Sequence, residues 1–212
     1  MMKRARFITF EGMDGSGKTT IISKLKQKFV EENIINNFVF TREPGSSKSD
    51  EAEKIRNFIL DNNNTFSSAV EALLFAASRR INLEKAIWPA LENNKIVISD
   101  RYYHSSLIYQ GVLGNVGIEQ VREINMIATD YTKPDLIIFF DLKPEISLQR
   151  ITQNRLVLDR METSDLEYYK KLHDGYKRLI DYEPEIFEIV DASKPIEEVL
   201  NDVLEIFKKK VL

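Results

Sequence analysis

Cysteine is absent from this sequence of 212 residues, and histidine occurs only twice, at His104 and His173. The absence of cysteine excludes disulfides, thiol catalysis and thiolate metal sites. Two histidines so far apart do not supply the ligand cluster that a zinc site requires. Any metal is therefore expected to be a hard cation that is held by oxygen atoms.

Long apolar runs are also missing. The sequence has no stretch of about 18 apolar residues, which is the length required to cross a membrane. The N-terminal residues lack the apolar segment of a signal peptide, so we expect a cytoplasmic protein with no membrane partner. A net charge of −3 argues against general nucleic-acid binding. With 43% hydrophobic and 30% charged residues, the composition suits one compact domain, residues 1–212.

The most informative feature of the sequence is one glycine-rich stretch. Gly12 to Thr19 fits the pattern G-x-x-x-x-G-K-[ST]. In this pattern backbone N–H groups surround a phosphate chain, the lysine reaches the β and γ phosphates, and the hydroxyl holds Mg²⁺. An apolar run precedes the stretch and a helical pattern follows it, which is the context that the motif requires. The residues expected to bind ATP are Gly12, Met13, Asp14, Gly15, Ser16, Gly17, Lys18, Thr19 and Thr20.

The remaining pattern alternates short apolar runs with amphipathic segments, which predicts a parallel sheet flanked by helices. The expected fold is that of the P-loop NTPases, a three-layer α/β/α arrangement around a five-stranded parallel sheet. Ligands are expected at the carboxyl edge of this sheet. The predicted strands cover residues 6–11, 38–41, 95–99, 135–141 and 186–190. The predicted helices cover residues 20–32, 50–60, 68–93, 105–112, 117–131, 165–182 and 196–211, and another begins at residue 144.

Residues 152–163 break the helical periodicity and carry Arg155 and Arg160. We expect this segment to form a short lid that closes over phosphates.

Two strand ends carry a carboxylate that could hold Mg²⁺ together with Thr19. Asp100 ends one apolar run and Asp141 ends another, and either could instead be structural. Asp100 is the favoured metal ligand because Arg101 follows it. In phosphoryl transfer, positioning and charge neutralisation provide most of the acceleration, so Lys18 and Arg101 are candidate catalytic residues.

Several motifs in order resemble those of the thymidylate kinase family, the nucleoside monophosphate kinases that phosphorylate dTMP. The similarity extends from about Phe7 to Ser193. It implies ATP-dependent conversion of dTMP to dTDP in dTTP synthesis, with Mg²⁺, and a homodimer formed through long helices. The motifs are FEGMDGSGKTT, TREPG, LLFAASRR, SDRYYHSSLIYQG, LDRME and VDAS.

The resemblance also implies an acceptor site for dTMP. Phe75 would stack on the thymine ring, Arg79 would contact the base, Arg101 would bind the phosphate, and Tyr109 would favour deoxyribose. The other residues implied in dTMP binding are Asp14, Glu43, Arg56, Ser105, Ser106 and Gln110.

Within the family, catalytic arginines lie either in the P-loop or in the lid. None of the four variable residues from Met13 to Ser16 is basic, so the chain resembles the bacterial layout, in which Arg155 and Arg160 would stabilise the moving phosphoryl group. Adenine would lie near the lid and near residues 191–193. One departure follows TREPG, where Ser46 replaces the family's usual further glycine, so we do not expect a glycine-dependent backbone shape there.

Two other functions remain open from the residues. A nucleoside kinase, or a kinase for another monophosphate, could use the same scaffold. The nucleoside kinase would need a carboxylate base, for which Glu11 and Glu43 are candidates. A nucleotide-gated switch is the other alternative, although the chain has no Asn-Lys-x-Asp motif for guanine.

Overall fold

The computed structural model describes Arg4 and residues 6–154 and 165–212. Five parallel strands form one sheet in the order β2-β3-β1-β4-β5. The α/β class and the five-stranded parallel sheet predicted from the sequence are therefore confirmed. The strands are β1 (Phe7–Glu11), β2 (Phe38–Arg42), β3 (Ile96–Asp100), β4 (Leu136–Asp141) and β5 (Phe187–Asp191).

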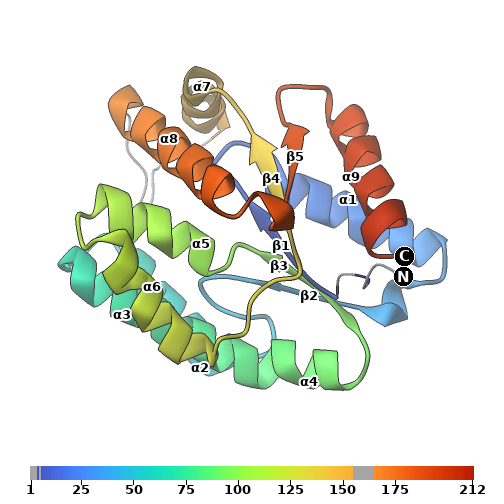
Figure 1. Cartoon of the computed structure of the whole chain (residues 1–212), viewed down its shortest axis with the longest axis horizontal. Helices are drawn as coiled ribbons and strands as arrows, with labels where there is room; N and C mark the ends of the chain where they lie inside the picture. The colour runs from blue at the N-terminus through green and yellow to red at the C-terminus, as the bar shows by residue number, and fades with distance from the viewer. Residues whose placement is uncertain (1–3, 5, 155–164) are drawn as a thin grey trace.

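Helices cover both faces of the sheet and complete the three layers. Helices α1 and α9 lie on one side, while α3, α5, α6 and α8 lie on the other (Figure 1). The helices are α1 (Lys18–Glu31), α2 (Asp50–Leu60), α3 (Ser68–Asn82), α4 (Trp88–Glu92), α5 (Tyr103–Ser106), α6 (Ile118–Thr129), α7 (Pro144–Asn154), α8 (Leu166–Tyr182) and α9 (Ile196–Lys210). Short 3₁₀ turns, η1 (Ile35–Asn37) and η4 (Pro184–Ile186), precede β2 and β5.

The helix predicted over residues 68–93 is interrupted by a π-helical segment, η2 (Leu83–Ile87), which separates α3 from α4. The interruption precedes Pro89, which has no N–H to donate to the carbonyl of the preceding turn. The helix predicted over residues 105–112 is also partly π-helical, because η3 (Leu107–Leu113) follows the short α5. The sequence predicted the positions of these helices but not their wider turns.

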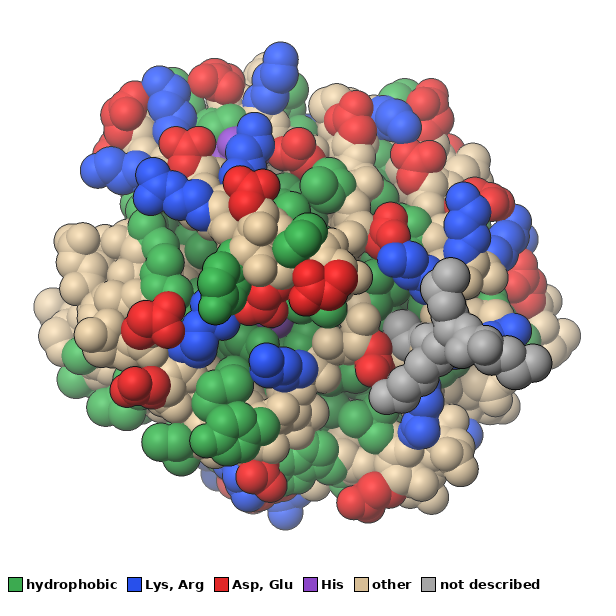
Figure 2. Space-filling view, in the orientation of Figure 1, with side chains coloured by type: hydrophobic (Ala, Val, Ile, Leu, Met, Phe, Trp, Pro, Cys, Tyr) green, Lys and Arg blue, Asp and Glu red, His purple; other side chains and the backbone are tan. Residues whose placement is uncertain are grey.

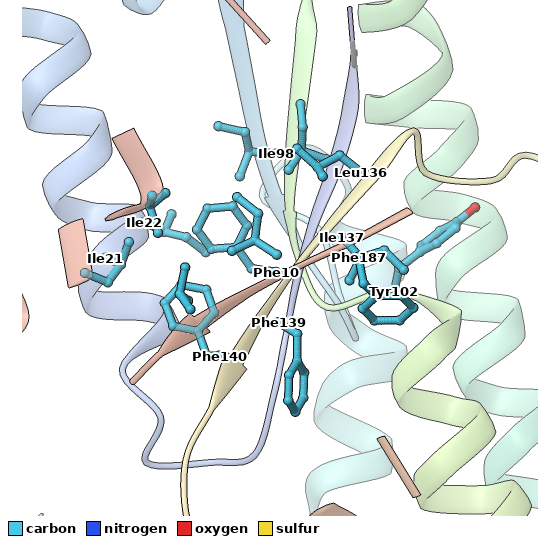
Figure 3. Close-up of a cluster of buried hydrophobic side chains, with 14 of the residues drawn as sticks. Phe10, Ile21, Ile22, Ile98, Tyr102, Leu136, Ile137, Phe139, Phe140 and Phe187 are labelled. Atoms are coloured by element: carbon cyan, nitrogen blue, oxygen red, sulfur yellow. The ribbon is translucent and has the colours of Figure 1, made fainter. Parts of the chain in front are cut away.

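Strand β4 is buried on both faces, as its apolar sequence predicted. On the α1 side, Phe10 and Phe140 lie near Ile21 and Ile22, while Tyr102 lies on the opposite side of the sheet (Figure 3). Alternation along β1 places Phe7, Thr9 and Glu11 on the side of Tyr102. One polar residue at the carboxyl end of β1 is thus enclosed beneath the functional edge of the sheet.

None of the helices within the described ranges has both the length and the apolar character required to cross a membrane. The predicted lid begins inside α7, since residues 152–154 are helical. The remainder of that segment, with Arg155 and Arg160, lies outside the described residues.

Candidate active site

A cleft of about 810 Å³ opens at the carboxyl edge of the sheet, where the sequence predicted ligand binding. One end is formed by the glycine-rich loop and the start of α1, and the other by α3, α5, η3 and the loop after β2. Predicted site residues that line it are Asp14, Gly15, Ser16, Gly17, Lys18, Thr19, Thr20, Glu43, Arg56, Phe75, Arg79, Asp100, Arg101, Ser105, Ser106, Tyr109 and Gln110. Its volume lies within the usual range of ligand-binding clefts.

The glycine-rich loop passes close to β4 and α7, and this approach requires glycine at two positions. Gly12 has φ 143°, and a Cβ there would lie 2.8 Å from the carbonyl oxygen of Phe140. Gly15 has φ 75°, and a Cβ there would lie 2.9 Å from the carbonyl oxygen of Ser147. The hydroxyl of Ser147 donates to the carbonyl of Asp14 at 2.6 Å, so α7 holds the loop in place.

The ammonium group of Lys18 is folded against this loop. Its Nζ donates to the carbonyls of Gly12 and Met13, both at 2.9 Å, and lies 3.3 Å from Oγ of Ser16. Burial, together with the charge of Arg101, lowers the pKa of Lys18 to about 8. The lysine is thus placed to bind anionic phosphate oxygens beside the loop. Gly12 and Met13 themselves do not line the cleft.

The two predicted metal-binding side chains lie together at the base of the P-loop. The hydroxyl of Thr19 donates to Oδ2 of Asp100 at 3.0 Å. A hydroxyl and a carboxylate are hard oxygen donors of the kind that Mg²⁺ prefers, so these two residues fit that ion. Asp141, the alternative ligand, does not line the cleft and lies 2.7 Å from Nε2 of His173 on α8.

Arg101 joins the two ends of the cleft. Its Nη2 donates to Oδ1 of Asp14 in the P-loop at 2.7 Å, and its Nη1 donates to Oγ of Ser105 at 3.0 Å. Its guanidinium also lies over the ring of Tyr109, whose hydroxyl donates to Asp14 at 3.2 Å. Arg101 has φ 72°, a conformation that costs free energy for a residue with a side chain and that often occurs at functional sites. The residue thus points a positive charge at the junction between the P-loop and the end of the cleft formed by α3, α5 and η3.

Arg79 is almost fully buried and lies four residues after Phe75 on α3. Its Nε donates to Oε2 of Glu43 at 2.6 Å, its Nη1 donates to Asn125, and its Nη2 donates to Ser106 at 3.2 Å. Burial raises the pKa of Glu43, while the charge of Arg79 opposes this rise. The pair holds the guanidinium, which lies over the ring of Tyr102 at 5.6 Å from its centroid.

Gln110 supplies a donor that no described residue accepts. Its side chain is buried and lines the cleft, and its Nε2 has no hydrogen-bond partner within residues 6–154 and 165–212. A buried donor without a partner is costly unless a ligand or water accepts its hydrogen bond. The amide is therefore suited to binding an oxygen or nitrogen acceptor on a ligand.

Helix α2 holds the loop after β2 against the cleft. Oε2 of Glu53 accepts from Nη2 of Arg42, and Oε1 accepts from the backbone N–H of Ser46, both at 2.7 Å. Nη1 of Arg56 donates to the carbonyl of Pro44 at 2.8 Å. In this loop Gly45 has φ 97°, whereas Ser46 has no positive φ, so the serine that departs from the resemblance fits the backbone.

Several lining residues were not among the predicted site residues. Arg150 on α7 donates to the carbonyls of Gly15 and Ala192, at 3.3 and 3.1 Å, and so joins the P-loop to the loop after β5. Arg150 belongs to no recognisable motif, because its contacts depend on the packing of α7. Near the predicted adenine loop, Ala192 and Lys194 line the cleft, but residues 191 and 193 do not. Arg42 and Pro44 of the TREPG motif also line the cleft, and the remaining lining residues, which were not predicted, are Leu60, Tyr102, Ile196 and Val199.

Known proteins resemble this chain over nearly its whole length. Residues 10–203 match the family model described as thymidylate kinase. The thymidylate kinase of Mycoplasmopsis agalactiae is 44% identical over 205 residues, which cover 96% of this chain and 95% of that protein. The thymidylate kinase of Finegoldia magna is also 44% identical over 205 residues, covering 96% of this chain and 98% of that protein.

A solved structure shows the same architecture. The crystal structure of thymidylate kinase from Ehrlichia chaffeensis aligns with a TM-score of 0.78 and 30% identity, covering 97% of this chain and 100% of that chain. The match of the family model and the near full-length identity to these relatives lead to one assignment. This chain belongs to the thymidylate kinase family.

Proposed function

We propose that the protein transfers the γ-phosphoryl group of ATP to dTMP, giving dTDP for dTTP synthesis. The observation that best supports this is the position of Arg101, which bonds to Asp14 of the P-loop at 2.7 Å while facing the acceptor end. An acceptor phosphate bound by Arg101 would lie beside the phosphate chain that the P-loop holds. Membership of the thymidylate kinase family supports the same choice of substrates.

At the donor end, the loop N–H groups and Lys18 bind the β and γ phosphates. Thr19 and Asp100 would hold Mg²⁺, which would neutralise charge on these phosphates. Arg150, Ile196 and Val199 line the cleft beyond the loop and form the proposed adenine site. The catalytic roles of Arg155 and Arg160, in the predicted lid of a single domain, remain predictions.

At the acceptor end, Phe75 stacks on thymine while Arg79, Ser106 and Gln110 provide polar contacts to the base. Tyr109 packs beside the sugar. Glu43 acts by placing Arg79, which donates to it. Arg56 acts by placing the loop after β2, to which it donates.

The acceptor oxygen needs no general base, because a phosphate is already ionised and attacks in line. A nucleoside kinase would instead need a carboxylate with an oxygen available to the substrate hydroxyl. Glu11 and Glu43 are both buried, and both oxygens of each are bonded to neighbouring groups. The acceptor is therefore proposed to be a monophosphate.

We also propose a homodimer formed through α3 and α6. Large apolar side chains on these neighbouring helices are exposed, with Leu73 at 56% and Ile127 at 76%. Hydrophobic side chains reach the surface at the lower left of Figure 2, in the region where Figure 1 labels α3 and α6. Exposed apolar residues gathered on adjacent helices are typical of an interface. The cytoplasmic location expected from the sequence stays a prediction.

An ADP-release assay with Mg-ATP tests the reaction, with dTMP, dUMP, dCMP, dGMP, AMP and thymidine offered separately. We expect preference for dTMP, and a kcat/KM for dTMP that falls by about 10²-fold or more in Arg101→Ala, since a charged contact to the transferring groups is lost. Arg80→Ala is the matched control, because Arg80 pairs with Glu84 on the surface of α3 and does not line the cleft. Turnover of thymidine without turnover of dTMP would reassign the protein as a nucleoside kinase.

A further inference from the structure

Glu11, the last residue of β1, has a fully buried carboxylate that the proposed reaction does not use. Three donors surround it: the backbone N–H of Tyr102 at 2.8 Å, the hydroxyl of Ser105 at 2.6 Å and the hydroxyl of Tyr176 at 3.0 Å. Burial raises the pKa of Glu11, and the charge of Arg101 and these donors oppose the rise. The charge of Arg101 and the three donors favour the ionised carboxylate. Hydrogen bonds to an ionised acceptor are short and strong, so this cluster is a rigid point below the cleft.

The short bond to Glu11 determines how Ser105 meets Arg101. A carboxylate only accepts hydrogen bonds, so the single proton of the Ser105 hydroxyl points to Oε2 of Glu11. The lone pairs of that hydroxyl are then available to Nη1 of Arg101, which donates to it at 3.0 Å. The direction of both hydrogen bonds therefore follows from the charge on Glu11.

Glu11 also supports the backbone next to Arg101. The N–H that donates to Oε1 belongs to Tyr102, the residue directly after the left-handed conformation at φ 72°. Residues in such conformations persist only where the surrounding structure holds them. One carboxylate thus contacts both the main chain and the hydroxyl that place the guanidinium.

We propose that Glu11 is a positioning residue that acts through Ser105 to hold Arg101 in the orientation that binds the acceptor phosphate. The inference rests on the proposed function, in which Arg101 is the phosphate-binding residue. It assigns no contact between Glu11 and either substrate. The role differs from that of a structural core residue, because it predicts that a change at Glu11 alters the KM for dTMP and not the KM for ATP.

Glu11→Gln tests this role because it keeps the size of the side chain and removes the charge. The glutamine amide would donate to Oγ of Ser105, so the serine proton would turn away from residue 11 and compete with Arg101. We expect the KM for dTMP to rise about tenfold, as for loss of one buried charged hydrogen bond, while the KM for ATP changes by less than about twofold. Thermal unfolding of each variant is measured first, and Glu11→Asp replaces Glu11→Gln if the latter does not fold, with the same expected direction.

A double-mutant cycle with Ser105→Ala tests the route of the effect. If Glu11 acts through Ser105, adding Glu11→Gln to Ser105→Ala changes the KM for dTMP by less than about twofold. Thr9→Val is the matched control, since Thr9 lies on the same face of β1, is fully buried and has a hydroxyl with no partner in the described part of the chain. This control is expected to leave both KM values unchanged.

Three results would overturn the proposal. They are an unchanged KM for dTMP in a folded Glu11 variant, an equal rise in both KM values, and full additivity with Ser105→Ala. The wild-type assay separates this failure from failure of the proposed function. A wild-type protein that phosphorylates dTMP while the Glu11 variants keep their KM refutes only the role of Glu11, whereas a wild-type protein that does not phosphorylate dTMP refutes the function itself.

Discussion

His104 is a fully buried imidazole, and neither ring nitrogen has a hydrogen-bond partner within residues 6–154 and 165–212. Its ring stacks on Tyr103 with 4.0 Å between centroids and meets the edge of Phe187. Burial, followed by the charges of Arg122, Arg79 and Lys133, lowers the pKa of His104 to about 3. The side chain is therefore neutral in the folded protein throughout the physiological range.

This burial predicts a stability that falls in acid. In the unfolded chain His104 takes up a proton near pH 6.5, whereas in the folded chain it does so only near pH 3. Below pH 6.5 the unfolded state therefore binds more protons, and stability is lost as the pH falls through this window. In His104→Phe this loss is absent. The difference in the free energy of unfolding between the variant and the wild type should therefore shift by about 1.4 kcal/mol in favour of the variant when the pH falls from 7.5 to 5.5.

Urea denaturation of both proteins at the two pH values measures this difference. All other titrating groups are shared, so they largely cancel in the comparison. A difference in unfolding free energy that is the same at both pH values would contradict the neutral, buried state of His104.

At the scale of elements, helix α2 sets the shape of the loop after β2. Glu53 accepts from both Arg42 and the backbone of Ser46, and it is only partly exposed. Glu53→Ala should therefore release this loop and raise the KM for dTMP about fivefold to tenfold, since two hydrogen bonds to a charged acceptor are lost. The KM for ATP should stay the same, because the loop belongs to the proposed acceptor end of the cleft.

Lys54→Ala is the control for this change, since Lys54 is an exposed neighbour on the same helix. Steady-state kinetics with each substrate varied in turn distinguish the two variants. Equal KM values for dTMP in Glu53→Ala and Lys54→Ala would show that α2 does not position the loop.

Local pattern predicted the elements better than their internal geometry. Apolar spacing located the segment 68–93 as helical, but the π-helical turn at Leu83–Ile87 depends on how the chain accommodates Pro89 within the fold. The P-loop could be predicted residue by residue, because its chemistry requires a contiguous sequence. Arg150 could not, because its contacts to Gly15 and Ala192 join residues 135 and 42 positions away along the chain.

For the whole molecule, the sequence predicted the sheet because strands and helices alternate, and alternation leaves few topologies. The residues of the proposed acceptor site were predicted from the family resemblance. Their proximity to one another could be seen only in the fold. Arg79 and Asn125, for example, are separated by 46 positions and meet only because α3 packs on α6. The cluster around Glu11 shows the same limit, since Tyr176 reaches it from 165 positions away.

Assembly is the last property at this scale, and a charge placed on α6 tests it. Ile127 is 76% exposed on the proposed dimer surface, and in a twofold interface each substitution occurs twice. Ile127→Glu would place two carboxylates in an apolar contact, where unpaired charges cost several kcal/mol. The Kd of the dimer should therefore rise by about 10²-fold or more.

Light scattering coupled to size-exclusion chromatography measures the mass of the wild type and the variant. Val30→Glu is the matched control, because Val30 is 57% exposed on α1, across the sheet from α3 and α6. The wild type and Val30→Glu should have the mass of two chains, and Ile127→Glu the mass of one. A wild type with the mass of one chain would rule out the dimer, whereas dissociation by both variants would show that the effect comes from added charge and not from loss of the α3 and α6 contact.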